Sequence, residues 1–299
     1  MTLRVAIVGT TGLIGHGIAA ALARDGHRVV AVGRGEAADV RFDLAAPQAA
    51  SLQGLAGCDA LVHAAGVTDE DLADPARAQA KTEGARVLAA AARAAGVRRL
   101  AYISSAHVYG PLEGRIDESR PPDPRSAYAR AHLAAEALFR EASESTGGAA
   151  LLARPCAAYG MPPSLARFGR WSLIPFDFPR QALTGRIVLK SHGGQRRNFV
   201  PAEGLGNLVA WWLGLAREGV TVANAPGRDE LSVYDFAWLC ATIAGAVTGR
   251  PCEVVRPEQA APAAAPLEYR TRVAGHLPGP SLEQHVLTLV HALSQEKAS

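Results

Sequence analysis

Three glycines near the N-terminus have the spacing of a phosphate-binding turn. Gly9, Gly12 and Gly15 directly follow a short apolar run and lead into a helical pattern. In such a turn the first glycine permits the tight bend, the second lets the backbone approach a phosphate, and the third allows close packing of helix on strand. The N–H groups that begin the helix then face the anion. The sequence therefore predicts that this turn holds the pyrophosphate of a dinucleotide. The other residues that we expect to line it are Thr11, Leu13 and Ile14.

The residues after the second apolar run bear on which dinucleotide is preferred. Arg34 stands there between Gly33 and Gly35, and Glu36 follows. A guanidinium can pair with a 2′-phosphate through two hydrogen bonds, whereas an acid in this place binds the ribose hydroxyl. Arg34 therefore favours NADP, and Glu36 leaves NAD possible.

Apolar runs and longer helical patterns alternate through the first half of the chain. The predicted strands are residues 4–8, 28–32, 60–63, 99–104 and 150–153, and the predicted helices are 13–24, 76–95 and 126–143. Strands without polar alternation, each followed by a helix, indicate a parallel sheet covered on both faces. With right-handed crossovers this pattern predicts a doubly wound α/β fold of the Rossmann type.

Residues beyond 160 follow a less regular pattern. The stretch 161–178, rich in proline and aromatic residues, predicts a cap over the sheet edge. Further strands are predicted at 186–190 and 221–224, and further helices at 203–217 and 232–246. We therefore expect a dinucleotide-binding domain in residues 1–160, to which elements within 186–246 return, and a smaller substrate-binding lobe of residues 161–185 and 247–299. The Pro/Ala segment 259–266 is either flexible or an ordered loop.

The composition argues against several classes of protein. The formal net charge of +3 is too small to indicate binding to nucleic acid or to a membrane surface. No apolar run approaches the roughly 20 residues of a membrane helix, and the run at 5–8 is too short for a signal peptide. The four cysteines are widely spaced, so we expect reduced thiols and no metal site. These features predict a cytoplasmic protein that acts on a small molecule.

Several short motifs occur in a fixed order along most of the chain. They are GTTGLIG at 9–15, FDL at 42–44, LVHAAG at 61–66, ISSAHVYG at 103–110, SAY at 126–128, ARP at 153–155 with YG at 159–160, and GGQRRNFV at 193–200. In this set the chain resembles the extended short-chain dehydrogenase/reductases, specifically the NAD-dependent epimerase/dehydratase group. The resemblance implies an NAD(P)-dependent oxidoreductase or epimerase that transfers hydride at a secondary alcohol or ketone. It also implies a homodimer, with the helices at 76–95 and 126–143 as the interface.

The resemblance implies roles for individual residues. Ser105 matches the hydroxyl that orients the substrate oxygen, and Tyr128 matches the tyrosine that transfers its proton. A phenol must lie within hydrogen-bond reach of that oxygen, because a proton leaves oxygen as hydride leaves carbon. The residues that match cofactor contacts are Asp43, Leu44, Ala64, Ala65, Gly66 and Pro155.

His132 departs from the family pattern, which is Tyr-x-x-x-Lys. The family lysine lies one helical turn from the tyrosine, holds the nicotinamide ribose and lowers the tyrosine pKa. A histidine is shorter and largely neutral near pH 7. Three interpretations follow. His132 replaces the lysine directly, or Lys81 on the helix at 76–95 supplies the cation, or Tyr128 is idle and the chain is a non-catalytic NADP-binding regulator. The presence of both Ser105 and Tyr128 disfavours the last interpretation.

Two further residues bear on the substrate. His107, two residues after Ser105, stands where related enzymes face their substrate, so it either takes part in proton transfer or substrate binding or is a hydrogen-bonded loop residue. Arg197 matches an arginine that meets the diphosphate of nucleotide sugars, and its planar, multi-donor geometry suits phosphate. The apolar cap at 161–178 instead suits an aromatic or polyketide-like ketone. The sequence leaves open whether the substrate is a nucleotide sugar or a small carbonyl metabolite.

Overall fold

The computed structural model describes residues 1–299 except 69–70, 72, 216, 258–264, 274, 276 and 297–299. Most of the Pro/Ala segment 259–266 therefore lies outside the described residues.

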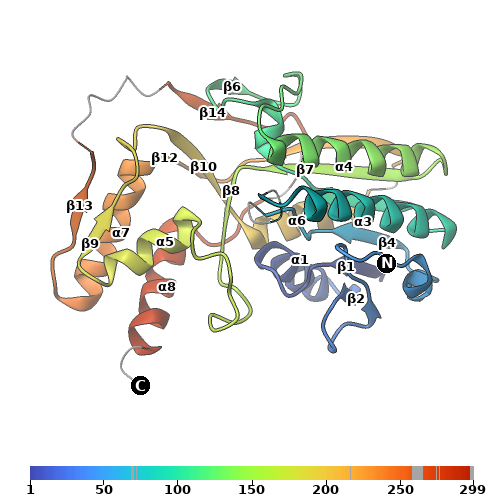
Figure 1. The fold of residues 1–299 in the computed structure, drawn as a ribbon, viewed down its shortest axis with the longest axis horizontal. Coiled ribbons are helices and arrows are strands. Elements are labelled where there is room, and N and C mark those ends of the chain that lie inside the picture. The colour runs from blue at the N-terminus through green and yellow to red at the C-terminus, as the bar shows by residue number, and fades with distance from the viewer. Residues whose placement is uncertain are drawn as a thin grey trace.

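A parallel sheet of seven strands, in the order β11-β7-β5-β4-β1-β2-β3, organises the chain (Figure 1). Its strands are β1 (Arg4–Val8), β2 (Arg28–Gly33), β3 (Val40–Arg41), β4 (Ala60–His63), β5 (Arg99–Ile103), β7 (Ala149–Pro155) and β11 (Gly219–Ala225). The chain leaves β3 at one edge and returns to β4 on the other side of β1. A ligand crevice is expected at the carboxyl ends of the strands where the order reverses. The predicted doubly wound fold is confirmed.

Helices cover both faces of this sheet. One layer holds α1 (Leu13–Arg24) and α6 (Ala202–Leu213), and the other holds α3 (Pro75–Ala94) and α4 (Ala127–Glu144). Alternate residues of β1 face the two helix layers. Val5 and Ile7 pack with α1 and α6, whereas Ala6 and Val8 pack with α3 and α4. Burial on both sides explains why these strands show no polar alternation.

The other elements form three small sheets beside a separate apolar core. The sheets contain β8 (Ala157–Tyr159), β10 (Arg196–Pro201) and β12 (Asp229–Ser232); β9 (Arg186–Val188) and β13 (Glu253–Val255); and β6 (Gly114–Ile116) and β14 (Leu267–Tyr269). The helices are α5 (Ile174–Ala182), α7 (Val233–Thr248) and α8 (Leu282–Glu296), with short 3₁₀ turns η1 (Ala49–Leu55) and η2 (Ala106–Tyr109). In Figure 1 the elements β9, β13, α5, α7 and α8 gather at the end of the molecule away from β1 and β2.

The elements within 186–246 divide between these two parts. Helix α6 packs on α1 and β11 pairs with β7, so both belong to the layers of the main sheet. By contrast, β9 pairs with β13, and the apolar side chains of α7 join those of β10 and α8 in the separate core. Each element lies where its apolar side chains are buried, and those of α7 pack on α5 and α8 and not on the seven-stranded sheet.

The segment predicted as a cap reaches back to the glycine turn. Its aromatic rings pack on one another, with centroids 5.2 Å apart for Phe168 and Trp171 and 4.5 Å apart for Phe168 and Phe176. Leu13, the first residue of α1, packs against the same cluster. The apolar cap therefore adjoins the start of the helix that is predicted to face the pyrophosphate.

Candidate active site

The glycine turn between β1 and α1 is closed by backbone contacts. Gly9 has a φ of 95°, and its N–H donates to the carbonyl of Val32 at 3.2 Å. A Cβ on Gly15 would lie 2.1 Å from the oxygen of Gly9, closer than any side chain can approach. Helix α1 begins after Gly12 without a side-chain cap, so its first N–H groups are left for a ligand. The turn fits an anionic group such as a pyrophosphate.

Several of the other residues matched to cofactor contacts adjoin this turn. A Cβ on Gly9 would lie 3.0 Å from the Cβ of Ala65, and the N–H of Ala64 donates to the carbonyl of Val8. Leu44 packs so closely on α3 that a Cβ on Gly84 would lie 2.3 Å from its carbonyl oxygen. These contacts place the loop after β4 beside the end of β1, where the strand order reverses, and the loop after β3 against α3. Pro155 ends β7, and Asp43 accepts a hydrogen bond from the N–H of Ala45 at 2.9 Å.

The end of β2 leaves Arg34 exposed. Within the described ranges no carboxylate pairs with its guanidinium, whereas Glu36 lies 3.8 Å from Arg41. The side chain of Glu36 is 97% exposed, so Arg41 holds it only loosely. Both residues that bear on cofactor preference are therefore accessible.

Helix α4 carries Tyr128 and His132 on one face. Ser126 begins the helix and its hydroxyl accepts a hydrogen bond from the N–H of Ala129 at 3.1 Å. This cap fixes where the first turn starts, and the rings of Tyr128 and His132, one turn apart, lie 4.5 Å apart at an interplanar angle of 64°. The predicted pair is thus brought into direct contact.

The ring of His132 is buried, with 2% of the residue exposed. Its Nδ1 lies 2.8 Å from the hydroxyl of Tyr102 on β5. Its Nε2 is buried and has no hydrogen-bond partner among the described residues. Burial, with a smaller contribution from His107, lowers the pKa of His132 to about 4. The imidazole is therefore neutral at physiological pH and brings no positive charge to Tyr128.

Ser105 and His107 lie on the turn η2, which packs against α4. The hydroxyl of Ser105 accepts a hydrogen bond from the N–H of His107 at 3.2 Å, and Ser105 is 3% exposed. The ring of His107 is exposed and meets the edge of the Tyr128 ring at a centroid distance of 5.9 Å. Ser105, His107, Tyr128 and His132 therefore form one group beyond the carboxyl end of β5.

Lys81 is bound to an acid on the neighbouring segment. Its ammonium forms an ion pair with Asp71 and donates to the carbonyl of Gly66 at 3.4 Å. Burial acts to raise the pKa of Asp71, but hydrogen bonds from Lys81 and Thr68 hold it below its usual value. Lys81 thus lies beside a residue matched to cofactor contacts, with its charge compensated by Asp71.

Two features of the site were not found from the sequence. Tyr102 lies within a buried apolar run, which hides a polar role. Glu136 follows His132 by one helical turn, accepts a hydrogen bond from Ser104 at 2.6 Å, and pairs with Arg154 through bonds of 2.9 and 2.6 Å. Only the spacing of Tyr128, His132 and Glu136 on one helical face could have pointed to it.

Arg197 lies on β10. Its guanidinium donates to the carbonyl of Arg196 at 2.8 Å and is half-buried. Its predicted role toward a diphosphate stays a prediction.

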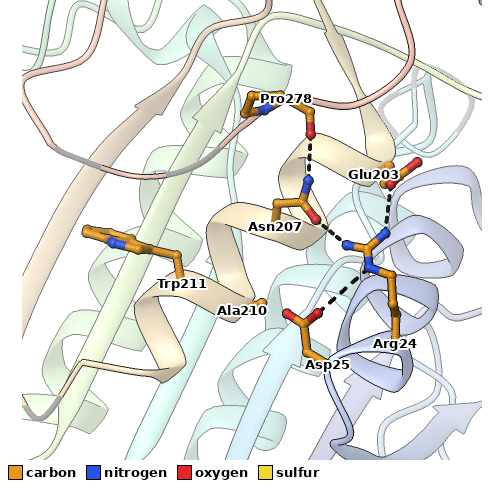
Figure 2. A pocket seen from close by; sticks show the side chains of 7 residues that line it. All are labelled: Arg24, Asp25, Glu203, Asn207, Ala210, Trp211 and Pro278. Carbon is orange, nitrogen blue, oxygen red and sulfur yellow. Dashed lines mark hydrogen bonds and ion pairs between the residues drawn. The ribbon is translucent and has the colours of Figure 1, made fainter.

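A surface hollow of about 550 Å³ lies away from these residues (Figure 2). Figure 2 shows Arg24 reaching two residues of α6, with bonds of 2.7 Å to Glu203 and 2.6 Å to Asn207. Asn207 in turn donates to the carbonyl of Pro278. Arg24 ends the helix that Leu13 begins, about 18 Å from the glycine turn. The hollow therefore joins α1, α6 and the segment around Pro278 and is separate from the candidate site.

The described residues contain no candidate metal cluster and no membrane-spanning helix. No group of three or more His, Cys, Asp or Glu side chains among them has the arrangement of a metal site. None of the helices in that part of the chain is long and apolar enough to cross a membrane.

A family model places the chain among known proteins. The model of the NAD dependent epimerase/dehydratase family matches residues 5–223. The chain belongs to this family. The prediction that the chain is an enzyme is thereby confirmed.

Two curated relatives of this family enzyme match over part of their length. The dTDP-D-glucose 4,6-dehydratase of Mus musculus is 29% identical over 166 residues, which cover 52% of the chain and 42% of that protein. The 4-hydroxy-2-methyl-3-oxo-4-farnesyl-3,4-dihydroquinoline-1-oxide ketoreductase of Stigmatella aurantiaca is 30% identical over 173 residues, covering 53% and 51%. The chain thus spans about half the length, or less, of the curated relatives it matches.

Solved structures share the fold over nearly the whole chain. MoeE5 in complex with UDP-glucuronic acid and NAD has a TM-score of 0.79 and 22% identity, covering 98% of this chain and 99% of that one. RMD from Pseudomonas aeruginosa complexed with NADPH has a TM-score of 0.76 and 23% identity, covering 99% and 98%. At these identities the likeness establishes the fold.

Proposed function

We propose that this enzyme transfers hydride between a nicotinamide dinucleotide and a secondary alcohol or ketone. The observation that carries the proposal is the contact of Tyr128 with His132 on one face of α4, beside Ser105 and beyond the carboxyl ends of the sheet strands. The glycine turn and the unpartnered buried Nε2 of His132 both fit a bound dinucleotide. When bound, that cofactor supplies or accepts the hydride.

The chain's own residues then orient the substrate, transfer the proton and bind the nicotinamide ribose. Ser105 orients the substrate oxygen, Tyr128 gives a proton to it or takes a proton from it, and His132 holds the nicotinamide ribose. Lys81 is a weaker candidate for the ribose contact because its ammonium is engaged by Asp71. His107 borders the substrate position, since its exposed ring meets Tyr128.

NADP is the proposed cofactor. Arg34 is exposed and has no carboxylate partner in the part of the chain that the structure describes, so its guanidinium is available to a 2′-phosphate. Glu36 is also exposed, so NAD remains the second candidate. Titration of NADPH and NADH by fluorescence decides between them, and tighter NADPH binding supports the proposal.

The substrate is either a nucleotide sugar or a small carbonyl metabolite. Support for the first comes from Arg197 and from MoeE5, whose structure holds UDP-glucuronic acid. Support for the second comes from the aromatic cluster of Phe168, Trp171 and Phe176 beside the glycine turn and from the ketoreductase among the relatives. NADPH consumption measured against a panel of ketones and nucleotide sugars tests the function. Turnover of a member of either class supports the proposal, and cofactor binding without turnover of any of them contradicts it.

We further propose a cytoplasmic homodimer that associates through α3 and α4. The proposal follows the family resemblance and the alanine-rich surfaces of these helices. The large apolar side chains Val188, Trp238 and Leu287, which are exposed in the described part of the chain, lie on other elements. Light scattering of the wild type and of a variant with charged residues on α3 checks both the dimer and its interface.

A further inference from the structure

Tyr102 places a phenol hydroxyl against the histidine that replaces the family lysine. It lies on β5 with 2% of the residue exposed, and its ring packs on those of His63 and Phe139 at centroid distances of 5.3 and 5.4 Å. Its hydroxyl lies 2.8 Å from Nδ1 of His132. The strand therefore holds the phenol rigidly against one nitrogen of the imidazole.

The hydrogen bond selects one tautomer of His132. Burial raises the pKa of Tyr102 well above its ordinary value, so the hydroxyl stays protonated. Within the described residues, Nδ1 of His132 is the acceptor within its reach. If Nδ1 carried the hydrogen, the hydroxyl would accept, and its own hydrogen would remain buried without a hydrogen-bond partner, which destabilises that arrangement. A phenol that donates to Nδ1 leaves the ring hydrogen on Nε2.

The opposite tautomer is a concrete alternative. A cavity of about 20 Å³ lies beside Tyr102 and is also lined by His63, Lys81 and Gly66. It has room for one water molecule, which could accept the phenol hydrogen instead. The two arrangements differ in which imidazole nitrogen carries the hydrogen, and that difference is measurable.

We propose that Tyr102 is a positioning residue that holds His132 with its hydrogen on Nε2 and aims that N–H at a hydroxyl oxygen of the nicotinamide ribose. This inference rests on the proposed function. Nε2 is buried, has no partner among the described residues, and belongs to a ring in contact with Tyr128. A neutral N–H in this place supplies the hydrogen bond of an ammonium group without its charge. The pair Tyr102–His132 thus takes over ribose binding and leaves the charge effect of the lysine unreplaced.

The first test reads the tautomer without cofactor. ¹⁵N-labelled histidine in the full chain gives distinct long-range couplings for the two tautomers, and His132→Gln assigns the signal. We expect the Nε2–H pattern for His132 in the wild type and a mixture of tautomers in Tyr102→Phe, which keeps the ring and removes the hydroxyl. An Nδ1–H pattern in the wild type would overturn the proposal.

The second test reads cofactor affinity by NADPH fluorescence. We expect Tyr102→Phe to raise the Kd for NADPH about three- to tenfold, as the loss of one hydrogen bond predicts. Tyr269→Phe is the matched control, because it removes an equally buried hydroxyl whose partner is the carbonyl of Arg154. It should leave the Kd unchanged. Thermal unfolding of each variant shows that it is folded at the assay temperature.

The double variant separates positioning from a general effect on the fold. If Tyr102 acts through His132, then Tyr102→Phe adds no further loss of affinity to His132→Ala. An equal loss in both backgrounds overturns the positioning role while leaving the proposed function intact. A wild type that binds neither NADPH nor NADH overturns both.

Discussion

The glycine turn and the face of α4 that carries Tyr128 and His132 belong to one enzyme but are built from different kinds of group. The turn between β1 and α1 consists of backbone: a positive φ at Gly9, a contact of Gly15 with the oxygen of Gly9, and uncapped N–H groups. The face of α4 consists of side chains, where Tyr128 meets a histidine in place of the family lysine. The first region follows the family pattern and the second departs from it.

The difference shows which part of the site tolerates substitution. No side chain fits at Gly15, because a Cβ there would overlap a backbone atom. At His132 the proposed ribose contact requires only a hydrogen-bond donor at one place, and a residue other than lysine can supply it when a neighbour such as Tyr102 fixes its ring. In a site formed by the backbone, steric overlap excludes every residue but glycine at such positions. In a site formed by side chains, another residue type can supply the same hydrogen bond.

Gly15→Val tests the backbone-built region and should have the largest effect. The new Cβ would lie 2.1 Å from the oxygen of Gly9, so the turn must open and the start of α1 must shift. We expect loss of NADPH binding and a large fall in thermal stability. Gly169→Ala is the control, since open space surrounds that position and φ there is not positive. NADPH binding by Gly15→Val at wild-type affinity would show that the turn does not hold the dinucleotide.

Tyr128→Phe tests the side-chain-built region. The ring and its contact with His132 remain, but the hydroxyl that we propose to exchange a proton with the substrate oxygen is removed. We expect kcat to fall about 10²- to 10⁴-fold, which is the usual contribution of general acid–base catalysis, with the Kd for NADPH little changed. Steady-state rates and fluorescence titration measure the two quantities. A variant with an undiminished kcat would mean that another group transfers the proton.

The stability of the protein in acid tests whether His132 is neutral. Burial lowers the pKa of His63 to about 3 and the pKa values of His132 and His285 to about 4. As the pH falls below about 6.5, these histidines become protonated in the unfolded chain but not in the folded protein. The free energy of unfolding therefore decreases by up to about 1.4 kcal/mol per pH unit for each such histidine. We therefore expect the free energy of unfolding to fall as the pH decreases from about 6.5 toward 4.

Variants assign the share of His132 in this loss. His132→Gln should show a shallower fall in stability over the same range, and His291→Gln, at an exposed position of α8, should follow the wild type. Denaturant titrations at a series of pH values measure both. If His132→Gln has the wild-type slope, then His132 takes up a proton in the folded protein as readily as in the unfolded chain, and burial does not keep it neutral in acid.

The sequence predicted the buried part of the fold best. The predicted ranges 4–8, 60–63 and 13–24 coincide with β1, β4 and α1, because strands covered on both faces and an amphipathic helix carry their signal locally. The strands β6 and β14 were not predicted. They have three residues each, and their partners lie about half the chain length apart, so no local sequence pattern indicates them.

The candidate site likewise contains residues that the sequence predicted and contacts that it could not predict. Residue types and spacing pointed to the glycine turn, to Ser105 and to Tyr128, and they marked His132 as a departure. They could not show that Tyr102, on a strand 30 residues before His132, hydrogen-bonds to its ring, because that contact exists only once α4 packs on the sheet. Nor could they show that Asp71 engages Lys81, since an ion pair between two separate segments of the chain leaves no periodic pattern.

Arg34→Ala is expected to have the smallest effect on NADPH binding, and it tests a side chain that lies outside the glycine turn. In the proposed complex the glycine turn holds the pyrophosphate that NAD and NADP share, so side chains beyond β2 determine which of the two is preferred. Arg34 is exposed there, and removing its guanidinium should raise the Kd for NADPH about tenfold, the lower end of the contribution of a charge-assisted hydrogen bond. The Kd for NADH should not change, because NADH lacks the 2′-phosphate. Glu36→Gln is the complementary variant, because it removes the carboxylate that would favour binding of NADH over NADPH. Equal weakening of both cofactors by Arg34→Ala would place Arg34 near the shared adenosine and not near the 2′-phosphate.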